Sequence, residues 1–208
     1  YFKYAIGEII LVVIGILIAL SINTWNETRK QVIAEKEIIN GIKKDLTEDK
    51  KYIQLVIKLA QKKDSIYTVL SNDLFMLYDT DRPVLDSLLR DYFAAQRTFY
   101  PISGSFESAI SGNEISKFNN KSFSAAATKL YNSTYARLID NGEDSDEKWF
   151  FLTKKYSEIR RTGHLPEMSK TQLNEFLNDV FYHMFGLNHY RNNLSNTIVE
   201  IDMLLLEH

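Results

Sequence analysis

The sequence predicts an all-α protein, in which a single transmembrane helix near the start of the chain continues into a long stalk helix and an extramembrane helical bundle. Three observations predict this class. An apolar run covers Ala5 to Ile22, a heptad repeat follows from Ile39 to Leu77, and amphipathic helical spacing recurs up to the last residues. We expect an anchor over residues 1–23 and one helical bundle domain over residues 24–208.

Composition and charge exclude several classes of protein. The 208 residues include no cysteine, so the chain can form no disulfide, zinc ribbon or iron–sulfur cluster. The 25 basic and 27 acidic residues are mixed along the chain and leave a net charge of -2, without the basic stripe that binds a phosphate backbone. We therefore expect no nucleic-acid partner and no cofactor.

The apolar run lies in residues 4–27, which read YAIGEIILVVIGILIALSINTWNE. Apart from Glu8, each residue from Ala5 to Ile22 is apolar or small, and about 20 such residues span the hydrocarbon core of a bilayer as a helix. A cleaved signal peptide would have a shorter apolar region and a small-residue cleavage site. Here the run is followed by Trp25, an aromatic residue typical of the membrane interface, which favours a retained transmembrane helix.

Glu8 shares one face of this helix with two small residues, Gly15 and Ala19. These residues return close to the same direction at about 100° per residue, and a small-xxx-small pair lets two membrane helices approach closely. One interpretation is that this face packs against a second copy or another membrane protein, with Glu8 in the contact or lining a polar lumen. The alternative is that Glu8 lies about one turn inside the boundary and snorkels to the lipid headgroups beside Lys3.

The orientation in the membrane stays open at this point. Lys3 precedes the helix, and Arg29, Lys30 and Lys36 follow it, a charge count that would place the following domain in the cytoplasm. The sequence starts at Tyr1 rather than methionine, so we expect a short upstream segment whose charges would change the count.

A long helix is predicted over residues 24–78, which contain no proline. Ten of the twelve a and d positions in its heptad frame are apolar or aromatic. The a positions are Ile39, Leu46, Ile53, Ala60, Tyr67 and Leu74, and the d positions are Ile42, Asp49, Val56, Lys63, Leu70 and Leu77. This seam can pair with other copies of the chain or with later helices of the same chain, and Asp49 and Lys63 can fix its register in either case.

The later part of the chain predicts five further helices. They cover residues 84–99, 105–111, 121–140, 145–162 and 170–207. Pro83 marks the start of the first, after Asp81 as its cap, and Gly112 suits the left-handed position after the second. Asn141 and Gly142 are expected to end the third helix, and the acidic run that follows them is expected to open the fourth.

The last predicted helix begins with the capping-box spacing of Ser169 and Gln172. It is long enough to lie antiparallel along the first long helix and to return the chain toward the membrane. Arg160, Arg161 and Gly163 carry the signals that end the helix before it. We expect the two longest helices to form a stalk, with the shorter helices packed at the end away from the bilayer.

The sequence offers few groups for chemistry. His183 and His189 are six residues apart, which places them on different faces of a helix and not at a metal-ligand spacing. Arg160, Arg161 and His164 could bind an anion, but basic residues in a last helical turn are the ordinary stop signal. No nucleophile, base and orienting residue can be assembled, so we expect neither a metal site nor an enzyme.

The stretch from Tyr4 to Glu27 closely resembles the amino-terminal signature of a bacterial membrane-protein family, domain of unknown function 6090. Residues 100–138, which read YPISGSFESAISGNEISKFNNKSFSAAATKLYNSTYARL, resemble a second pattern of that family. The resemblance implies an amino terminus in the cytoplasm and a helical domain in the periplasm of a Gram-negative cell. It makes Glu8 the signature glutamate, whereas Thr24 departs from the more common asparagine. No activity, ligand or catalytic residue is implied.

We therefore expect a non-enzymatic, single-span inner-membrane protein that self-associates through Glu8, Gly15 and Ala19. It would display a periplasmic helical bundle as a scaffold or interaction module. Its partners would be the lipid bilayer and either other copies of the chain or another membrane protein. Two alternatives stay open: an ion-conducting or proton-coupled oligomer with Glu8 lining its axis, and a periplasmic small-molecule sensor that acts through a partner.

Overall fold

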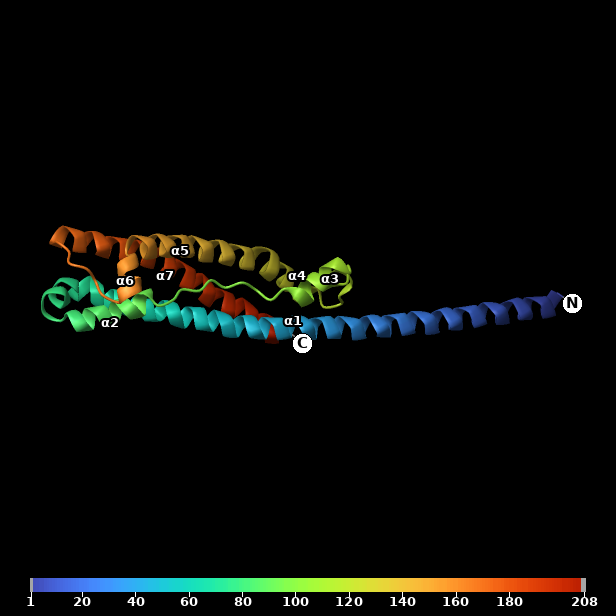
Figure 1. Ribbon diagram of the computed structural model, residues 1–208. Coiled ribbons are helices and arrows are strands. Elements are labelled where there is room, and N and C mark those ends of the chain that lie inside the picture. The colour runs from blue at the N-terminus through green and yellow to red at the C-terminus, as the bar shows by residue number, and fades with distance from the viewer. Residues whose placement is uncertain (1, 207–208) are drawn as a thin grey trace.

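The computed structural model describes residues 2–206, with side chains described from residue 6 onward, and the regular elements in that range are helical (Figure 1). In chain order they are α1 (Phe2–Thr80), α2 (Arg82–Phe93), α3 (Gly104–Ser111), the 3-10 turn η1 (Ile115–Lys117), α4 (Lys121–Lys129), the π-helical turn η2 (Leu130–Thr134), α5 (Tyr135–Lys155), α6 (Ser157–Thr162) and α7 (Lys170–Leu206). The predicted all-α class is confirmed. One long helix carries the apolar run, and the other helices pack along its far part.

The apolar run and the heptad seam lie on one uninterrupted helix, α1. The most deeply buried seam residues, each 0% exposed, are Ile42, Leu46, Ile53 and Leu70. α7 lies antiparallel on this seam, because the Lys43 ammonium donates to the Leu205 carbonyl at one end. Further along α1, the Arg191 guanidinium pairs with Asp64 at 2.8 Å. The seam therefore pairs within the chain, which decides the question that the heptads leave open.

α7 begins at the predicted capping box and packs between α1 and α5. The Ser169 amide donates to Gln172 Oε1 at 2.8 Å, and the Gln172 amide donates back to Ser169 Oγ at 3.3 Å. These bonds satisfy two amides that have no partner within the helix. The last described residue of α7 is Leu206, beside the first seam residues of α1, and residue 207 of the predicted helix lies outside the described residues.

α2 begins as predicted but ends earlier. The Asp81 carboxylate accepts a hydrogen bond from the Val84 amide at 3.3 Å, and Pro83 occupies the first turn. The helix ends at Phe93, whereas the sequence predicts it to continue to residue 99. Its buried face packs against the far part of α1.

Residues 95–102 form an extended segment instead of a helix (Figure 1), because side chains of other elements accept hydrogen bonds from two of their backbone amides. The Phe99 amide donates to the Tyr190 hydroxyl of α7 at 2.8 Å. The Ile102 amide donates to the Asp49 carboxylate of α1 at 2.9 Å. Phe99 itself is fully buried, so the segment is held by core packing as well as by these two bonds.

The prediction of a helix break at Asn141 and Gly142 is wrong. The chain is helical from residue 121 to 155, through the π turn and across both residues. A Cβ built on Gly142 would lie 2.5 Å from the Thr98 methyl group and 3.0 Å from the Tyr190 ring. The glycine is therefore explained by close packing of the extended segment and α7 against α5, and not by a turn.

The actual break comes at Tyr156, whose φ of -111° and ψ of 41° interrupt the helix before α6. The sequence predicts that the acidic residues 143–147 open a helix. They lie inside α5 instead. α6 ends as expected, with Arg160 and Arg161 in its last turn and Gly163 left-handed at a φ of 74°.

The end of α3 also differs from the prediction. Gly112 has a φ of -79°, in the right-handed region, and Asn113 takes the left-handed position at a φ of 52°. Asparagine tolerates this conformation better than most residues with a side chain. The helix itself covers the predicted residues and begins one residue earlier.

The short helices lie at both ends of the bundle, and not only at the end away from the bilayer (Figure 1). α3, η1 and α4 lie near Glu35 of α1, whose carboxylate accepts hydrogen bonds from the Asn119 and Asn120 amides at 2.9 Å each. The extended segment causes this arrangement, because its eight residues at about 3.3 Å each carry the chain roughly 26 Å back along α1.

Substituting Gly142 by alanine is expected to lower the free energy of unfolding by about 1–2 kcal/mol, because overpacking against Thr98 and Tyr190 outweighs the helix-propensity gain. Gly104→Ala is the matched control, since a Cβ at Gly104 would meet no atom within 4 Å. Thermal unfolding of the full chain in mild detergent should show a lower Tm for Gly142→Ala than for the control. Equal Tm values would contradict the packing explanation.

Candidate functional site

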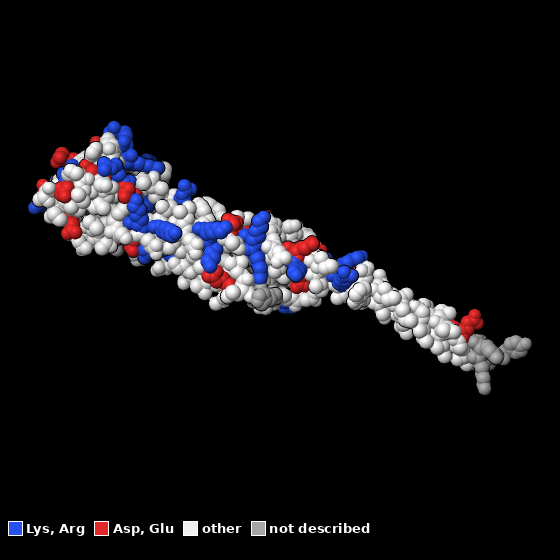
Figure 2. Space-filling model, turned by 90° about the horizontal axis from the view of Figure 1, so that it is seen from below, with Lys and Arg blue, Asp and Glu red and all other residues white. Residues whose placement is uncertain are grey.

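The apolar part of α1 is long and apolar enough to cross a membrane. Its side chains from Ile6 to Ile22 are all exposed, and Figure 2 shows charged side chains crowded on the bundle and sparse along this extension. Glu8, Gly15 and Ala19, which we call the Glu8 face, lie on one side because the helix is unbroken here. A Cβ built on Gly15 would meet no atom within 4 Å, so packing within the described chain does not explain this glycine.

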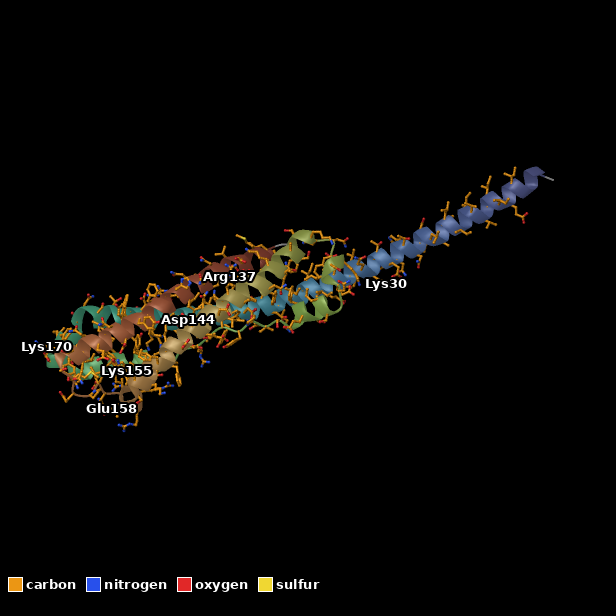
Figure 3. The ribbon with its side chains drawn as sticks, turned by 90° about the horizontal axis from the view of Figure 1, so that it is seen from above. Lys30, Arg137, Asp144, Lys155, Glu158 and Lys170 are labelled. Carbon is orange, nitrogen blue, oxygen red and sulfur yellow. The ribbon has the colours of Figure 1, made fainter. Side chains whose placement is uncertain are left out.

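The end of the apolar run combines an aromatic ring with cations. Trp25 is 64% exposed, and the Arg29 guanidinium carbon lies 5.9 Å from its ring centroid. Lys30 lies on α1 beyond the other helices (Figure 3). Such a ring beside basic residues is typical of a membrane–water interface. The side chain of Lys3, the other predicted interface residue, lies outside the part of the chain whose side chains are described.

A second feature is a buried polar cluster where α2, α5 and α7 meet the extended segment. The Tyr92 hydroxyl donates to His183 Nδ1 at 2.7 Å, and His183 Nε2 donates to Gln96 Oε1 at 2.7 Å. The Gln96 amide nitrogen donates to the Ser145 carbonyl at 2.9 Å and to the Asp146 carboxylate at 3.0 Å. Because the Gln96 nitrogen points to these acceptors, its oxygen faces His183 and fixes the proton on Nε2.

Lys63 of α1 lies beside this cluster and is 4% exposed. Its ammonium is 3.1 Å from the Trp149 ring centroid and has no hydrogen-bond partner among the described residues. Burial, followed by repulsion from the Arg160 guanidinium, lowers the pKa of Lys63 to about 6. Burial and repulsion from Lys63 lower the pKa of His183 to about 3, so the imidazole is neutral at pH 7. Contact with the indole face offsets part of the cost of burying the amine.

Asp49, the other polar residue of the seam, is 1% exposed. Its carboxylate accepts hydrogen bonds at 2.9 Å from the Ile102 amide and from the Tyr135 hydroxyl. Burial raises the pKa of Asp49 to about 6, and nearby Asp45 adds to the effect. Asp49 therefore joins the extended segment and α5 to α1.

These buried contacts were not predicted from the sequence, although it contains a signal for them. Asp49 and Lys63 are polar residues at d positions of an otherwise apolar seam, which indicates a polar contact opposite each one. Ile102 and Tyr135, the hydrogen-bond partners of Asp49, and Trp149, whose ring faces Lys63, all lie far from α1 in the sequence. No local pattern brings them together.

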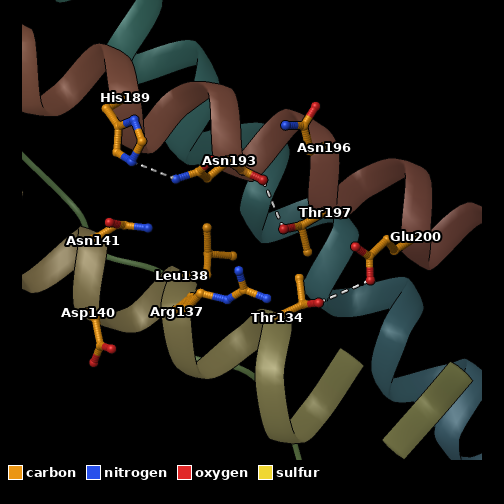
Figure 4. Close-up of a pocket in the computed structure, with 10 residues that line it drawn as sticks. All are labelled: Thr134, Arg137, Leu138, Asp140, Asn141, His189, Asn193, Asn196, Thr197 and Glu200. Atoms are coloured by element: carbon orange, nitrogen blue, oxygen red, sulfur yellow. Dashed lines mark hydrogen bonds between the residues drawn. The ribbon is translucent and has the colours of Figure 1, made fainter. Parts of the chain in front are cut away.

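A third feature is a groove of about 500 Å³ between α5 and α7, beside the π turn (Figure 4). Its lining consists of Thr134, Arg137, Leu138, Asp140, Asn141, His189, Asn193, Asn196, Thr197 and Glu200. Figure 4 shows Arg137 reaching toward α7, and its guanidinium donates to Ser133 Oγ one turn earlier at 3.2 Å. Thr134 donates to Glu200 across the groove at 3.0 Å. The amide, hydroxyl and charged groups here can hydrogen-bond a polar molecule.

The two histidines of α7 belong to separate features, as their spacing predicts. His183 is enclosed in the buried cluster, whereas His189 lies 3.1 Å from the Asn193 amide in the groove. Within residues 2–206, no three His, Asp or Glu side chains form a group that could hold a metal ion.

The fold and these features define an all-helical protein in which one candidate membrane helix also forms the central helix of a folded bundle. The chain belongs to a family of unknown function (DUF6090), whose model matches residues 8–174. The match begins at Glu8, covers the whole Glu8 face and extends to the start of α7, and it confirms the resemblance seen in the sequence. No curated protein and no solved structure matches the chain.

Proposed function

We propose that this is a non-enzymatic, single-span inner-membrane protein that self-associates through the Glu8 face and displays its bundle in the periplasm as a scaffold or interaction module. Residues 1–23 would be the anchor and residues 24–208 the bundle. The continuity of α1 carries this proposal, because the candidate span and the central helix of the bundle are one element. At about 1.5 Å per residue, the part of α1 beyond Trp25 projects roughly 80 Å. Contact between copies in the membrane would bring their bundles side by side.

The Glu8 face also continues as an open surface along the bundle. Thirty-six residues make about ten turns of an α-helix, so Lys44, Lys51 and Leu55 lie in register with the three residues of that face. All three are exposed, and Leu55 leaves an apolar side chain 44% exposed. A second copy can therefore lie along α1 without displacing α2 or α7. This geometry supports pairing along α1 as far as Leu55; the next position in register with Glu8 is Lys62, which pairs with Asp91 of α2.

The membrane placement rests on the exposed apolar run and on Trp25 and Arg29 at its end. The orientation, with the amino terminus in the cytoplasm, rests on the family resemblance. The alternative of an ion-conducting oligomer uses the same assembly and differs only in the role of Glu8, which would line the axis.

Replacing Gly15 by leucine is expected to abolish the oligomer, because the larger side chain prevents close approach of two helices on the Glu8 face. The measurement is the mass of the intact, detergent-solubilised full chain. Gly7→Leu is the matched control: a Cβ at Gly7 also meets no atom within 4 Å, but it points about 80° away from Gly15. A monomeric wild type, or a Gly15→Leu protein that keeps the wild-type mass, would contradict the proposal.

Glu8→Gln separates the scaffold from the conducting assembly. The conducting alternative predicts ion flux across liposomes that contain the wild-type protein. It also predicts that Glu8→Gln abolishes this flux while the oligomer persists. An oligomer without flux favours the scaffold. Loss of the oligomer in Glu8→Gln would place the carboxylate in the helix contact itself.

A further inference from the structure

A pocket of about 330 Å³ lies between the end of α2 and the end of α6. Its lining consists of Arg90, Phe93, Ala94, Ile159, Arg160, Arg161, Thr162 and Gly163. Phe93 and Ile159 are buried and form an apolar floor. The three arginines supply the charged part of the wall, and they come from two helix ends that are distant in the sequence.

Local packing positions Arg90 at this pocket. A Cβ built on Gly163 would lie 2.6 Å from Arg90 Cδ and 2.7 Å from Arg90 Cγ, so the stem of the arginine lies directly over the glycine. The left-handed φ of 74° at Gly163 suits a residue without a side chain. A glycine here thus serves both as the end of α6 and as the support for Arg90.

The positive charge of the pocket exceeds the negative charge that faces it. Arg161 has only a long contact of 4.0 Å with Glu158, and Arg90 and Arg160 form no ion pair among the described residues. His164, which the sequence places in a possible anion site with Arg160 and Arg161, instead lies 2.6 Å from Asp86. The pocket therefore contains Arg90, which the sequence does not predict there, and does not contain His164, which it does.

The buried amine of Lys63 lies close to this excess of positive charge. Lys63 has no hydrogen-bond partner among the described residues, and after burial the Arg160 guanidinium is the group that most lowers its pKa. Lys63 therefore lies within the electrostatic reach of the pocket. An anion bound to Arg160 would offset the effect of that guanidinium on Lys63 and so raise the pKa of the amine.

We propose that this pocket binds the phosphate group of a small soluble molecule through Arg90, Arg160 and Arg161. Guanidinium groups match phosphate oxygens with paired, charge-assisted hydrogen bonds, and three of them can surround one tetrahedral anion. The volume suits a small molecule rather than a polymer.

The height of the pocket above the membrane argues against a lipid headgroup as the source of the phosphate. Lys62 of α1 pairs with Asp91 at 2.9 Å, so Arg90 lies near the level of residue 62. At about 1.5 Å per residue this level is roughly 55 Å beyond Trp25. This step rests on the proposed membrane anchor, whereas the charge and the geometry of the pocket do not.

The test is thermal unfolding of the full chain in non-ionic detergent, with inorganic phosphate added at constant ionic strength. At a phosphate concentration about tenfold above the dissociation constant, the wild-type Tm should rise by about 3 °C over the chloride reference. Arg160→Gln and Arg90→Gln should each weaken the phosphate affinity by about tenfold or more. Arg97→Gln, which removes an exposed arginine that does not line this pocket, is the matched control for charge and should keep the wild-type response.

Two results would overturn this proposal. The first is a phosphate response that is absent in the wild type or equal in the wild type and both pocket variants. The second is a Tm rise with a short-chain phosphatidic acid but none with inorganic phosphate, which would make the ligand a lipid. The thermal shift is independent of the oligomer mass. The phosphate proposal can therefore fail while the proposed self-association stands.

Discussion

Replacing Lys63 by methionine is expected to raise the free energy of unfolding by about 1–4 kcal/mol at pH 6. Methionine fills a similar volume and needs no hydrogen-bond partner, whereas the Lys63 amine is buried without one among the described residues. Lost contact with the Trp149 ring reduces the gain, which is why the lower limit is small.

The gain should depend on pH in a defined direction. The pKa of Lys63 is about 6 in the folded protein and 10.5 ordinarily, so between these values the unfolded chain binds the proton that the folded chain excludes. Wild-type stability therefore rises with pH across this window, and the advantage of Lys63→Met shrinks toward pH 10.5. Tm values of the full chain at pH 6 and pH 9 measure this, with the exposed Lys58→Met as control. A destabilised Lys63→Met, or a gain equal at both pH values, would contradict the account.

Removing the Asp49 carboxylate is expected to have the largest destabilising effect at a single polar side chain. Asp49→Ala leaves the Ile102 amide and the Tyr135 hydroxyl without their acceptor in a buried position, at a cost of about 2–4 kcal/mol. Asp49→Asn keeps an acceptor for the amide, and its nitrogen can donate to the tyrosine hydroxyl. The asparagine variant should therefore remain within about 1 kcal/mol of the wild type at pH 7, or exceed it.

The pH dependence at Asp49 has the opposite sign to that at Lys63. The folded pKa of about 6 lies above the ordinary value of 3.8, so the folded chain binds the extra proton between them. Wild-type stability should fall as pH rises from 3.8 to 6, and Asp49→Asn should lack this fall. Tm values at pH 4 and pH 7 for the three proteins measure it. An Asp49→Ala protein as stable as Asp49→Asn would show that the two hydrogen bonds contribute nothing.

The two long helices could be predicted from the sequence because their signals are local and repeated. Ten of the twelve seam residues of α1 are buried and the other two, Ile39 and Tyr67, are half-buried, and α7 starts at the capping box of Ser169 and Gln172. The repeat could not show whether the seam pairs within or between chains, since an apolar stripe accepts either partner. The answer depends on the antiparallel contact between α1 and α7.

The wrongly predicted helix ends result from tertiary contacts. Asn141 and Gly142 form a strong stop signal, yet Gly142 is a point of close approach for Thr98 and Tyr190 inside a continuous helix. Residues 94–99 have acceptable helix propensity, but Asp49 and Tyr190 capture the backbone donors of the extended segment. Both cases involve residues of α1 or α7 that no local window contains.

The Glu8 face and the arginine pocket also differ in how far the sequence could predict them. The Glu8 face could be predicted because a single helix fixes the relative directions of its three residues. The arginine pocket could be predicted only in part: Arg160 and Arg161 are adjacent in sequence, but Arg90 joins them through packing over Gly163. His164 was misassigned because its partner Asp86 lies on another helix.

Cross-linking between copies in native membranes tests most directly whether one face of α1 pairs from the bilayer into the bundle. The chain has no cysteine, so Asn26→Cys and Leu55→Cys each introduce a single thiol in register with the Glu8 face. The account predicts disulfide-linked dimers at both positions under mild oxidation. Gln61→Cys, also exposed but turned about 120° from Leu55, should not form them. Cross-links absent at both face positions, or equally strong at Gln61→Cys, would contradict it.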